Sequence, residues 1–479
     1  MRRGSPGLDY IQHQPPALYI HNPSASLPCD EIERRYFELF HEEIRINFCG
    51  YFGTPFWTQL VSRECHHEPA IRHAIFAFAA LCKSSRCNGD TAIVPDEHLN
   101  FALVQYGKAV RSLRQNLAEG VSCVRLALIA SVLFGWFESF YGNWKSAAQQ
   151  IRGGLNILRH LKGASNINTR KQRMAAQGLN SIDPELSHAL GCLRVHLILF
   201  LAMNPLHDYP FDDSEDQAIE DQAIEDEAMM QNCPSWFATL NEAFPSALSI
   251  SMRSILLLRR CSKYTNSEPS ELLRFSITRQ QENLSRAVDQ WNKAFHPILI
   301  DARQNMISRT HLKVLELHIS IVTAKIIILT NIYREEITFD KYTLQFQYIV
   351  SISRRILEKE QEFRVLTDPK AQLNVGMIMA LYYTATRCRD PFVRRDAIAV
   401  LKEWPSRYGI WDSWQAAKVA EWILRIEEEG CDSYRFIPEE RRVRMTSLNM
   451  EVHSGGRISV ECTQGPAEHV LKLWKADLL

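Results

Sequence analysis

The stretch CVRLALIASVLFGWFESF at residues 123–140 decides the fold, because it is apolar at almost every position. A stretch that is apolar all round predicts a helix packed on every side, whereas a surface helix has one apolar face. Gly142 and Asn143 then have the residue types of a turn. Helical spacing resumes after them at Ala148, Ile151, Leu155 and Leu158. The sequence therefore predicts a helical hairpin around a central buried helix.

Helical periodicity continues on both sides of this hairpin. Residues 97–117 place apolar side chains at alternating steps of three and four, which predicts a one-faced amphipathic helix; they are Leu99, Leu103, Tyr106, Val110, Leu113 and Leu117. A second stripe consists of Leu284, Val288, Trp291 and Phe295. Residues 311–333 are a long apolar run. These patterns predict an all-α fold, a multi-helical bundle of helical hairpins.

Local signals mark where several helices begin. Asp183-Pro184 and Asp390-Pro391 each combine a capping residue with a proline that suits the first helical position. Asp412 and Gln415 have the spacing of a capping box. Strand-like alternation is found only in RMTSLNMEVHSGGRISVEC, residues 444–462, on either side of two glycines. That pattern predicts a small C-terminal β-hairpin, whose free edge offers a pairing site to another chain.

These signals divide the chain into five parts. We expect a disordered arm or linker at 1–30, an N-terminal helical subdomain at 31–162 and a partly disordered linker at 163–235. We further expect a C-terminal helical subdomain at 236–433 and a tail with the β-hairpin at 434–479. Within the linker, one helix is expected at about 184–203, followed by an acidic repeat.

Composition narrows the functional classes. The 479 residues contain 55 Lys and Arg and 55 Asp and Glu, without the basic excess typical of nucleic-acid-binding proteins. Apolar runs such as 197–203 and 326–329 are shorter than the roughly 20 residues of a membrane span. The 12 cysteines are scattered and no secretory leader precedes them, which favours reduced thiols inside the cell. We expect no membrane association.

The segment CHHEPAIRHA, residues 65–74, first suggests a metal site. Helical metal motifs place ligands four residues apart on one face. His67 and His73 are six apart, and His66 and His73 share a face but lie two turns apart. Pro69 also suits the first position of a helix, which leaves His66 and His67 outside it. We therefore interpret Glu68-Pro69 as a helix start and predict no metal site.

Two other groups of side chains lack the context of a complete site. Cys82 and Cys87 in CKSSRC are expected in a loop and have no second cysteine pair at a matching interval. Asp212, Asp213 and Asp216 have the spacing of a magnesium–diphosphate motif, but they run into the tandem repeat EDQAI at 215–224. That acidic run is interpreted as a flexible linker, with a weak activation-type segment as the alternative.

Three stretches together resemble the fungal-specific transcription factor regulatory domain. They are GYFGTPFWTQLVSRECHHEPAIRHAIFAFAAL at 50–81, QYGKAVRSLR at 105–114 with LFGWFESFYGNWKSAAQQIRGGLNIL at 133–158, and the stretch from ATRCRDPFVRR to LRIEEEG at 385–430. The three blocks occur in order between about residues 30 and 450. The resemblance implies an all-helical regulatory domain, located in the nucleus or shuttling to it, that controls metabolic or secondary-metabolite genes.

The chain departs from that family at its N-terminus. Members carry a binuclear zinc cluster with six cysteines, whereas only Cys29 precedes Cys49 here. Either an upstream exon is missing or the protein is a derived regulator without that module. We therefore expect no direct sequence-specific DNA binding, and action through protein partners such as full-length zinc-cluster factors or a second copy of the chain.

One aromatic cluster near the C-terminus is a candidate pocket for a small-molecule effector or a partner helix. It comprises Trp404, Tyr408, Trp411, Trp414 and Trp422. Ordinary core packing is the interpretation that we favour, because aromatic residues also dominate cores. We predict no catalytic residue, no cofactor and no metal ligand. The alternatives are an all-α biosynthetic enzyme using the Asp212, Asp213 and Asp216 site, and a non-catalytic interaction scaffold.

Overall fold

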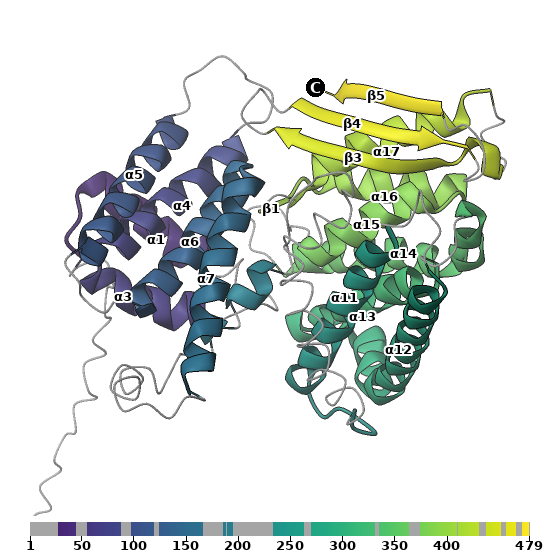
Figure 1. Cartoon of the computed structure of the whole chain (residues 1–479), viewed down its shortest axis with the longest axis horizontal. Helices are drawn as coiled ribbons and strands as arrows, with labels where there is room; N and C mark the ends of the chain where they lie inside the picture. Colours follow the sequence, from purple (N-terminus) through teal and green to yellow (C-terminus); the bar gives the residue numbers. More distant parts are fainter. Residues whose placement is uncertain are drawn as a thin grey trace, which may run out of the picture.

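A computed structural model describes residues 27–44, 55–87, 97–118, 124–165, 185–187, 189–194, 233–262, 270–330, 335–363, 374–409, 411–430, 437–451, 457–465 and 472–478. Over these residues the fold is all-α with small sheets towards the C-terminus, as predicted (Figure 1). Two groups of helices lie side by side, and the larger sheet covers the C-terminal group (Figure 1).

The first group surrounds one central helix. Its elements are α1 (Glu31–Leu39), η1 (Phe40–Ile44), η2 (Phe56–Leu60), α3 (Val61–His67), α4 (Pro69–Cys87), α5 (Glu97–Ala118), α6 (Val124–Tyr141) and α7 (Trp144–Ser165). The predicted hairpin is α6 and α7, joined at Gly142, whose φ of 88° suits glycine. α6 is long and apolar enough to cross a membrane, but 78% of it is buried inside the protein, as in the core helix of a globular fold.

α5 is a helix as predicted, but its apolar stripe is not its most buried face. The fully buried positions are Ala102, Gln105 and Ala109, which face the alanine-rich α4. Small side chains on both helices let the two backbones approach closely. The stripe is consequently turned to one side of the contact, and Leu103 and Leu117 remain 38% and 51% exposed.

The second group begins after a long connection. Its elements are α11 (Leu240–Ser262), α12 (Glu271–Asn305), α13 (Arg309–Thr330), η3 (Glu336–Tyr342), α14 (Thr343–Glu362), α15 (Val375–Arg387), α16 (Pro391–Glu403) and α17 (Ser413–Glu428). The predicted stripe of α12 is buried as expected, with Trp291 and Phe295 stacked at 4.2 Å between ring centroids. Residues 185–187 and 189–194 are helical, within the predicted 184–203 helix.

Helix starts follow the sequence signals where they are described. The Asp390 carboxylate accepts hydrogen bonds from the backbone N–H groups of Phe392 and Val393, with Pro391 at the first helical position. The Asp412 carboxylate accepts from the backbone N–H of Gln415. Asp183-Pro184 lies outside the described residues.

A short turn in the second group packs against the first group. β1 (Arg407–Tyr408) and β2 (Trp411–Asp412) form a two-residue antiparallel ladder on either side of Gly409, whose φ is +65°. Arg407 Nη2 donates to the Phe140 carbonyl at 2.5 Å, and the Tyr408 ring meets Trp136 edge-on at 5.3 Å. The C-terminal part of the chain thereby contacts the end of α6.

The C-terminal sheet is larger than the predicted hairpin. β3 (Val443–Glu451) and β4 (Arg457–Gln464) are antiparallel as predicted, and β5 (Lys472–Leu478) adds a third strand to β4. The predicted turn at Gly455-Gly456 lies outside the described residues. Val443, Val460 and Cys462 are buried where the sheet covers the helices, and Figure 1 shows α17 beneath it.

The loop prediction for residues 82–87 is wrong. These residues form the last turns of α4, which ends at Cys87. The reason is that the buried face of α4 continues through Leu81, Cys82 and Ser84. The η4 turn (Glu439–Arg441) is a further short element, just before β3.

Candidate functional site

The histidine-rich segment at residues 65–74 is a junction between two helices. His66 and His67 end α3, and Pro69 begins α4, as the sequence predicted for Glu68-Pro69. Arg72 Nη1 donates to the carbonyl oxygens of Cys65 and His66, at 3.1 and 3.3 Å, and so satisfies the end of α3.

The imidazoles of this segment have separate surroundings. His73 Nδ1 lies 2.7 Å from Gln105 Oε1 on α5, while the His66 ring contacts Phe37 edge-on. Burial raises the pKa of the Cys65 thiol to about 12, so it is not a ready metal ligand or nucleophile. Among the described residues, no group of three His, Cys, Asp or Glu side chains is placed to hold a metal ion.

Buried polar pairs in the first group connect helices. Gln105 Nε2 donates to Glu33 Oε1 at 2.8 Å, which links α5 to α1. Tyr106 Oη donates to Glu138 Oε1 at 2.7 Å, which links α5 to α6. Burial raises the pKa of Glu138, and the hydrogen bond from Tyr106 opposes that rise. Each polar group is thus used by a neighbour in the fold.

The aromatic residues predicted as a candidate pocket do not converge on one cavity. Trp411 and Trp422 are buried, Trp404 and Tyr408 are half-buried, and Trp414 is 45% exposed. Trp411 packs on Tyr382, whereas Tyr408 packs on Trp136 of the other group. The ammonium groups of Lys402 and Lys418 both lie over the Trp414 ring, 5.5 and 5.8 Å from its centroid. Their placement matches the packing interpretation.

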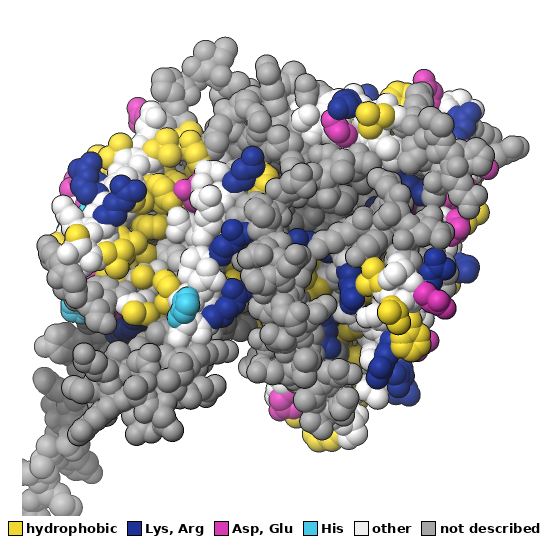
Figure 2. Space-filling view, viewed as in Figure 1, with side chains coloured by type: hydrophobic (Ala, Val, Ile, Leu, Met, Phe, Trp, Pro, Cys, Tyr) yellow, Lys and Arg dark blue, Asp and Glu magenta, His cyan; other side chains and the backbone are white. Residues whose placement is uncertain are grey.

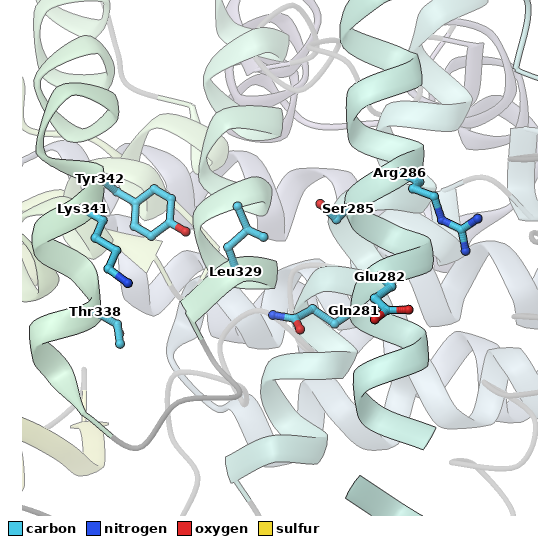
Figure 3. A pocket seen from close by; sticks show the side chains of 8 residues that line it. All are labelled: Gln281, Glu282, Ser285, Arg286, Leu329, Thr338, Lys341 and Tyr342. Atoms are coloured by element: carbon cyan, nitrogen blue, oxygen red, sulfur yellow. The ribbon is translucent and has the colours of Figure 1, made fainter. Parts of the chain in front are cut away.

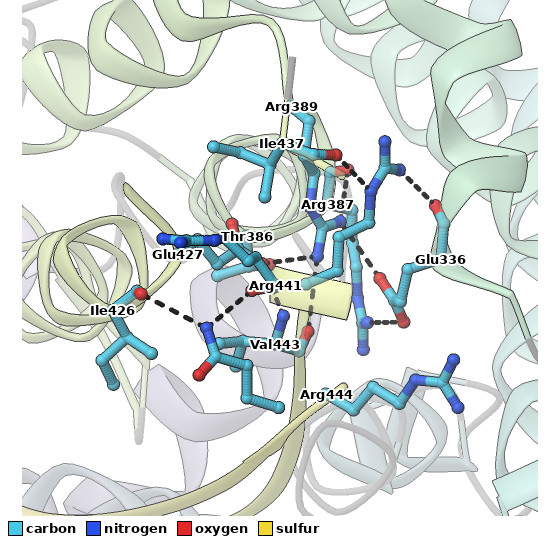
Figure 4. Close-up of polar contacts among 12 residues, drawn as sticks. Glu336, Thr386, Arg387, Arg389, Ile426, Glu427, Ile437, Arg441, Val443 and Arg444 are labelled. Carbon is cyan, nitrogen blue, oxygen red and sulfur yellow. Dashed lines mark hydrogen bonds and ion pairs between the residues drawn. The ribbon is translucent and has the colours of Figure 1, made fainter. Parts of the chain in front are cut away.

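Among the described residues, the largest concentration of buried charge lies between η3, α15, α16, α17 and β3 (Figure 4). Its centre is Glu427, whose side chain is fully buried. Glu427 Oε1 accepts from Arg389 Nη2 at 2.8 Å and from the backbone N–H of Val443 at 2.7 Å. Glu427 Oε2 accepts from Arg394 Nη1 at 2.6 Å. One carboxylate therefore ties α17 to the start of α16 and to β3.

A second carboxylate extends this network to η3. Glu336 forms ion pairs with Arg387 at 2.5 Å and with Arg389 at 3.0 Å (Figure 4). The Arg442 guanidinium holds Asp340 through two hydrogen bonds of 2.8 and 2.6 Å. Both ends of η3 are therefore fixed by arginines from elsewhere in the chain.

Backbone groups complete the network. Glu439 accepts hydrogen bonds from the backbone N–H groups of Glu336 and Ile337, at 2.8 and 2.7 Å, and so caps the start of η3. Arg442 also donates to the carbonyl oxygens of Ile437 and Glu336. We call the set of Glu336, Asp340, Arg387, Arg389, Arg394, Glu427, Glu439, Arg442 and Arg444 the buried charge network.

The electrostatics of the network keep Glu427 and Glu336 ionised. Burial alone would raise the pKa of Glu427, but Arg389 and Arg394 lower it below its ordinary range. For Glu336, burial is likewise outweighed by Arg387 and Arg389, which lower the pKa. Glu427 is ionised and accepts hydrogen bonds on both oxygens, so it is poorly suited to proton transfer or metal binding. The network therefore holds segments together.

One open cavity of about 500 Å³ lies between α12, α13 and η3 (Figure 3). Its lining residues are Gln281, Glu282, Ser285, Arg286, Leu329, Thr338, Lys341 and Tyr342. Gln281 Nε2 already donates to the Ile328 carbonyl, and Figure 3 shows Arg286 pointing away from the η3 side. Ser285 has no histidine among these neighbours to activate its hydroxyl. The lining offers polar contacts, without a nucleophile–base pair.

Sequence reasoning missed the buried charge network. Its members are spread between residues 336 and 444, and single arginines and glutamates usually indicate solvent-exposed positions. The one local signal was Cys388-Arg389-Asp390-Pro391, in which Asp390 caps α16 and Arg389 is fully buried. The Asp212, Asp213 and Asp216 motif and the acidic repeat at 215–224 lie outside the described residues.

No protein-family model, no curated protein and no solved structure matches this chain.

Proposed function

We propose that this chain is a non-catalytic regulator of transcription, similar to the fungal-specific regulatory domain, that works by binding other proteins. In this proposal it carries no zinc-cluster module within its 479 residues and makes no sequence-specific DNA contact of its own. It acts in the nucleus on metabolic or secondary-metabolite genes. Its helices provide a rigid binding surface, and its partners provide the sequence-specific binding to DNA.

The observation that carries the proposal is that the three stretches of family resemblance meet in space. The first and second are joined by the His73–Gln105 hydrogen bond and by the edge-on contact of Phe78 with Phe140, 5.2 Å between ring centroids. The second and third are joined by the Arg407–Phe140 hydrogen bond. Because the three stretches that resemble the family pattern also contact one another in the fold, we take them as parts of one family-like domain.

The polar residues of those stretches support a role in architecture. Arg72 caps α3, Tyr106 holds Glu138, and Arg389 holds Glu427. An active site keeps at least some polar groups free to meet a substrate. In the parts of the chain that the structure describes, the polar residues named here are occupied by other parts of the fold, which favours a binding function over catalysis.

A tethering assay tests the proposal. The full chain is fused to an unrelated DNA-binding module and directed to a reporter promoter in a fungal cell. We expect reporter transcription to change at least several-fold, and the untethered chain to leave the reporter unaffected. A Glu427→Ala fusion, in which the core is disrupted, serves as the control. It should lose the effect on transcription if the effect needs the folded chain. Unchanged transcription with a stable, nuclear fusion protein would contradict the proposal.

The enzyme alternative has a direct test of its own. Purified chain is incubated with magnesium and prenyl diphosphates of several lengths, and release of inorganic diphosphate is measured. We expect no turnover above the background of a variant with Asp212, Asp213 and Asp216 changed to Asn. Magnesium-dependent turnover that this triple variant loses would replace a regulatory role with a catalytic one.

A further inference from the structure

The apolar stripe of α5 is a surface without a complete cover. Leu103 and Leu117 are 38% and 51% exposed, and Leu99, Tyr106, Val110 and Leu113 are only half-buried. The stripe from Leu99 to Leu117 extends over about 27 Å at 1.5 Å per residue. A contiguous apolar strip of this length on a water-soluble face marks an interaction site more often than a chance exposure.

The stripe continues onto α6 through aromatic contacts. The Tyr106 ring stacks on Phe137 at 4.1 Å between centroids, and Phe137 in turn stacks on the half-buried Tyr141 at 6.1 Å. Figure 2 shows hydrophobic side chains gathered over this part of the first helical group, between the lysine and arginine side chains of α5 and those of α7. The apolar surface is therefore bordered on two sides by basic residues.

The border carries mostly basic side chains on a chain that is neutral overall; the acids against it are Glu33, paired with Lys108 at 3.4 Å, and Glu138, bonded to Tyr106. α5 carries Lys108, Arg111 and Arg114, with Glu97 as its one acidic residue. α7 carries lysines and arginines but no aspartate or glutamate anywhere in Trp144–Ser165. By comparison, the whole chain has 55 basic and 55 acidic residues.

The basic residues of α7 are also aligned. Lys145, Arg152 and Arg159 recur every seven residues, which places them along one face of the helix. Figure 2 shows Lys and Arg side chains following the length of α7 beside the hydrophobic area. An apolar strip with a parallel row of positive charge is the complement of a helix that has one apolar face and acidic flanks.

We infer that the α5 stripe, with the basic residues of α5 and α7, is the docking surface for an acidic amphipathic helix of another protein. The apolar face of that helix covers Leu103, Val110 and Leu117, and its carboxylates face Arg114 and the α7 row. This is helix-in-groove recognition, in which apolar side chains at steps of three and four give affinity and the flanking charges select the partner. The inference rests on the proposed function and names its partner class.

The apolar centre of the docking surface favours an acidic helix over a nucleic acid as its partner. Nucleic-acid surfaces make most of their contacts to phosphate and need polar, basic side chains throughout the contact area. Here the centre of the surface consists of leucine, valine and aromatic side chains, which phosphate does not satisfy. A helical peptide offers both the apolar face and the carboxylates.

Fluorescence anisotropy with three labelled helical peptides of about 20 residues tests the inference, because that length matches the stripe. The first has a leucine stripe and glutamate flanks, the second the same stripe with lysine flanks, and the third glutamate flanks with an alanine stripe. We expect saturable binding of the first to the full chain. The other two should bind at least about ten-fold more weakly, and added salt should weaken the first complex.

Substitutions at solvent-accessible positions locate the site without disturbing the core. Leu117→Glu and Arg159→Glu should each reduce affinity for the acidic peptide by about ten-fold, which corresponds to about 1.4 kcal/mol. Leu272→Glu and Arg279→Glu are matched controls, since Leu272 is 84% exposed and both residues lie on α12 in the other helical group. The controls should bind as the unmodified chain does. Unchanged melting temperatures verify folding in all four.

Several outcomes would overturn the inference. Equal binding of the acidic and basic peptides, or equal losses in the α12 controls, would exclude this surface. Binding of duplex DNA or phosphatidylserine vesicles in place of the acidic peptide would assign it to another class of partner. Peptide binding only after deletion of residues 212–228 would identify the chain's own acidic segment as the occupant, and a concentration-dependent dimer would identify a second copy. An active tethered reporter with no peptide binding would reject this inference and leave the proposed function standing.

Discussion

The two helical groups are held together by different physics. Around α6 the contacts are almost entirely apolar and aromatic, with alanines on α4 and α5 allowing close approach. Around η3 and α17 the centre is the buried charge network, in which Arg389, Arg394 and Glu427 are fully buried. Apolar packing degrades gradually as side chains are trimmed, whereas a buried ion network depends on each of its members. The comparison implies that single substitutions at the centre of the second group lower its stability more than single substitutions in the first group.

Removing the central carboxylate should have the largest effect. Glu427→Ala leaves Arg389 and Arg394 buried without their shared partner, and such losses typically cost about 3–5 kcal/mol. Urea unfolding measures the change. Glu421→Ala is the matched control, because its partner Lys402 and Glu421 are 34% and 40% exposed, and the loss there should stay below about 1 kcal/mol. Similar losses in both variants would refute a special role for the network.

A pair of adjacent glycines on α7 tests the tight packing of the first group. A Cβ at Gly154 would lie 2.5 Å from Ser131 Oγ and 2.8 Å from Leu190 Cδ2, so Gly154→Ala should cost about 1–3 kcal/mol. Gly153 has open space around it, and Gly153→Ala should stabilise the helix by about 0.5–1 kcal/mol. Thermal unfolding of both variants gives the two signs. Two stabilised variants would mean that α7 packs less closely than described.

A histidine in the second group makes stability depend on pH. His318 Nδ1 lies 2.8 Å from Tyr348 Oη, and burial, assisted by Arg303, lowers the pKa of His318 to about 3. The folded chain therefore keeps this imidazole neutral while the unfolded chain takes up a proton below about pH 6.5. Stability is complete above that value and is lost as the pH falls towards 3.

The slope of that loss should be up to about 1.4 kcal/mol per pH unit from His318. Glu427 and Glu336 act in the same direction at lower pH, because their pKa values are also lowered in the folded chain. His318→Asn should flatten the slope between pH 6 and 5, and His296→Gln, at an exposed site on α12, should not. Urea midpoints across this range measure it, and identical slopes in all three proteins would contradict the assignment.

A small loss of stability is expected at the start of α16. Asp390→Ala removes the carboxylate that accepts from Phe392 and Val393, which should cost about 1 kcal/mol. Asp390→Asn should recover most of that loss, since an amide oxygen also caps a helix. Equal losses in both variants would mean that the negative charge, rather than the cap, matters at this position.

Local patterns predicted the helices well, because apolar periodicity and capping residues act within one or two turns. The α6–α7 hairpin, the α12 stripe and the start at Asp390-Pro391 are of this kind. The rotation of α5 was not predictable in the same way, since it depends on how closely the alanines of α4 allow Ala102 and Ala109 to approach. Hydrophobicity alone ranks Leu103 above Ala102 for burial, and the close helix contact reverses that order.

The buried charge network could not be predicted from the sequence. The partners Glu336 and Arg389, or Asp340 and Arg442, are separated by 50 to more than 100 residues, and nothing local pairs them. The third strand β5 was missed for a related reason, because its pairing with β4 is set by the sheet it joins. Within the described residues, the sequence predicted which segments form helices or strands. Which segments pair with one another became clear only from the folded structure.

The Arg407 contact has a consequence for the order in which the protein is made. Its guanidinium bonds to the carbonyl of Phe140, 267 residues earlier in the chain. During translation the first helical group therefore emerges long before the turn that covers the end of α6, and domains generally begin folding as they leave the ribosome. Until the turn at Arg407 has emerged, Trp136 lacks its edge-on contact with Tyr408, and the first helical group must fold without it.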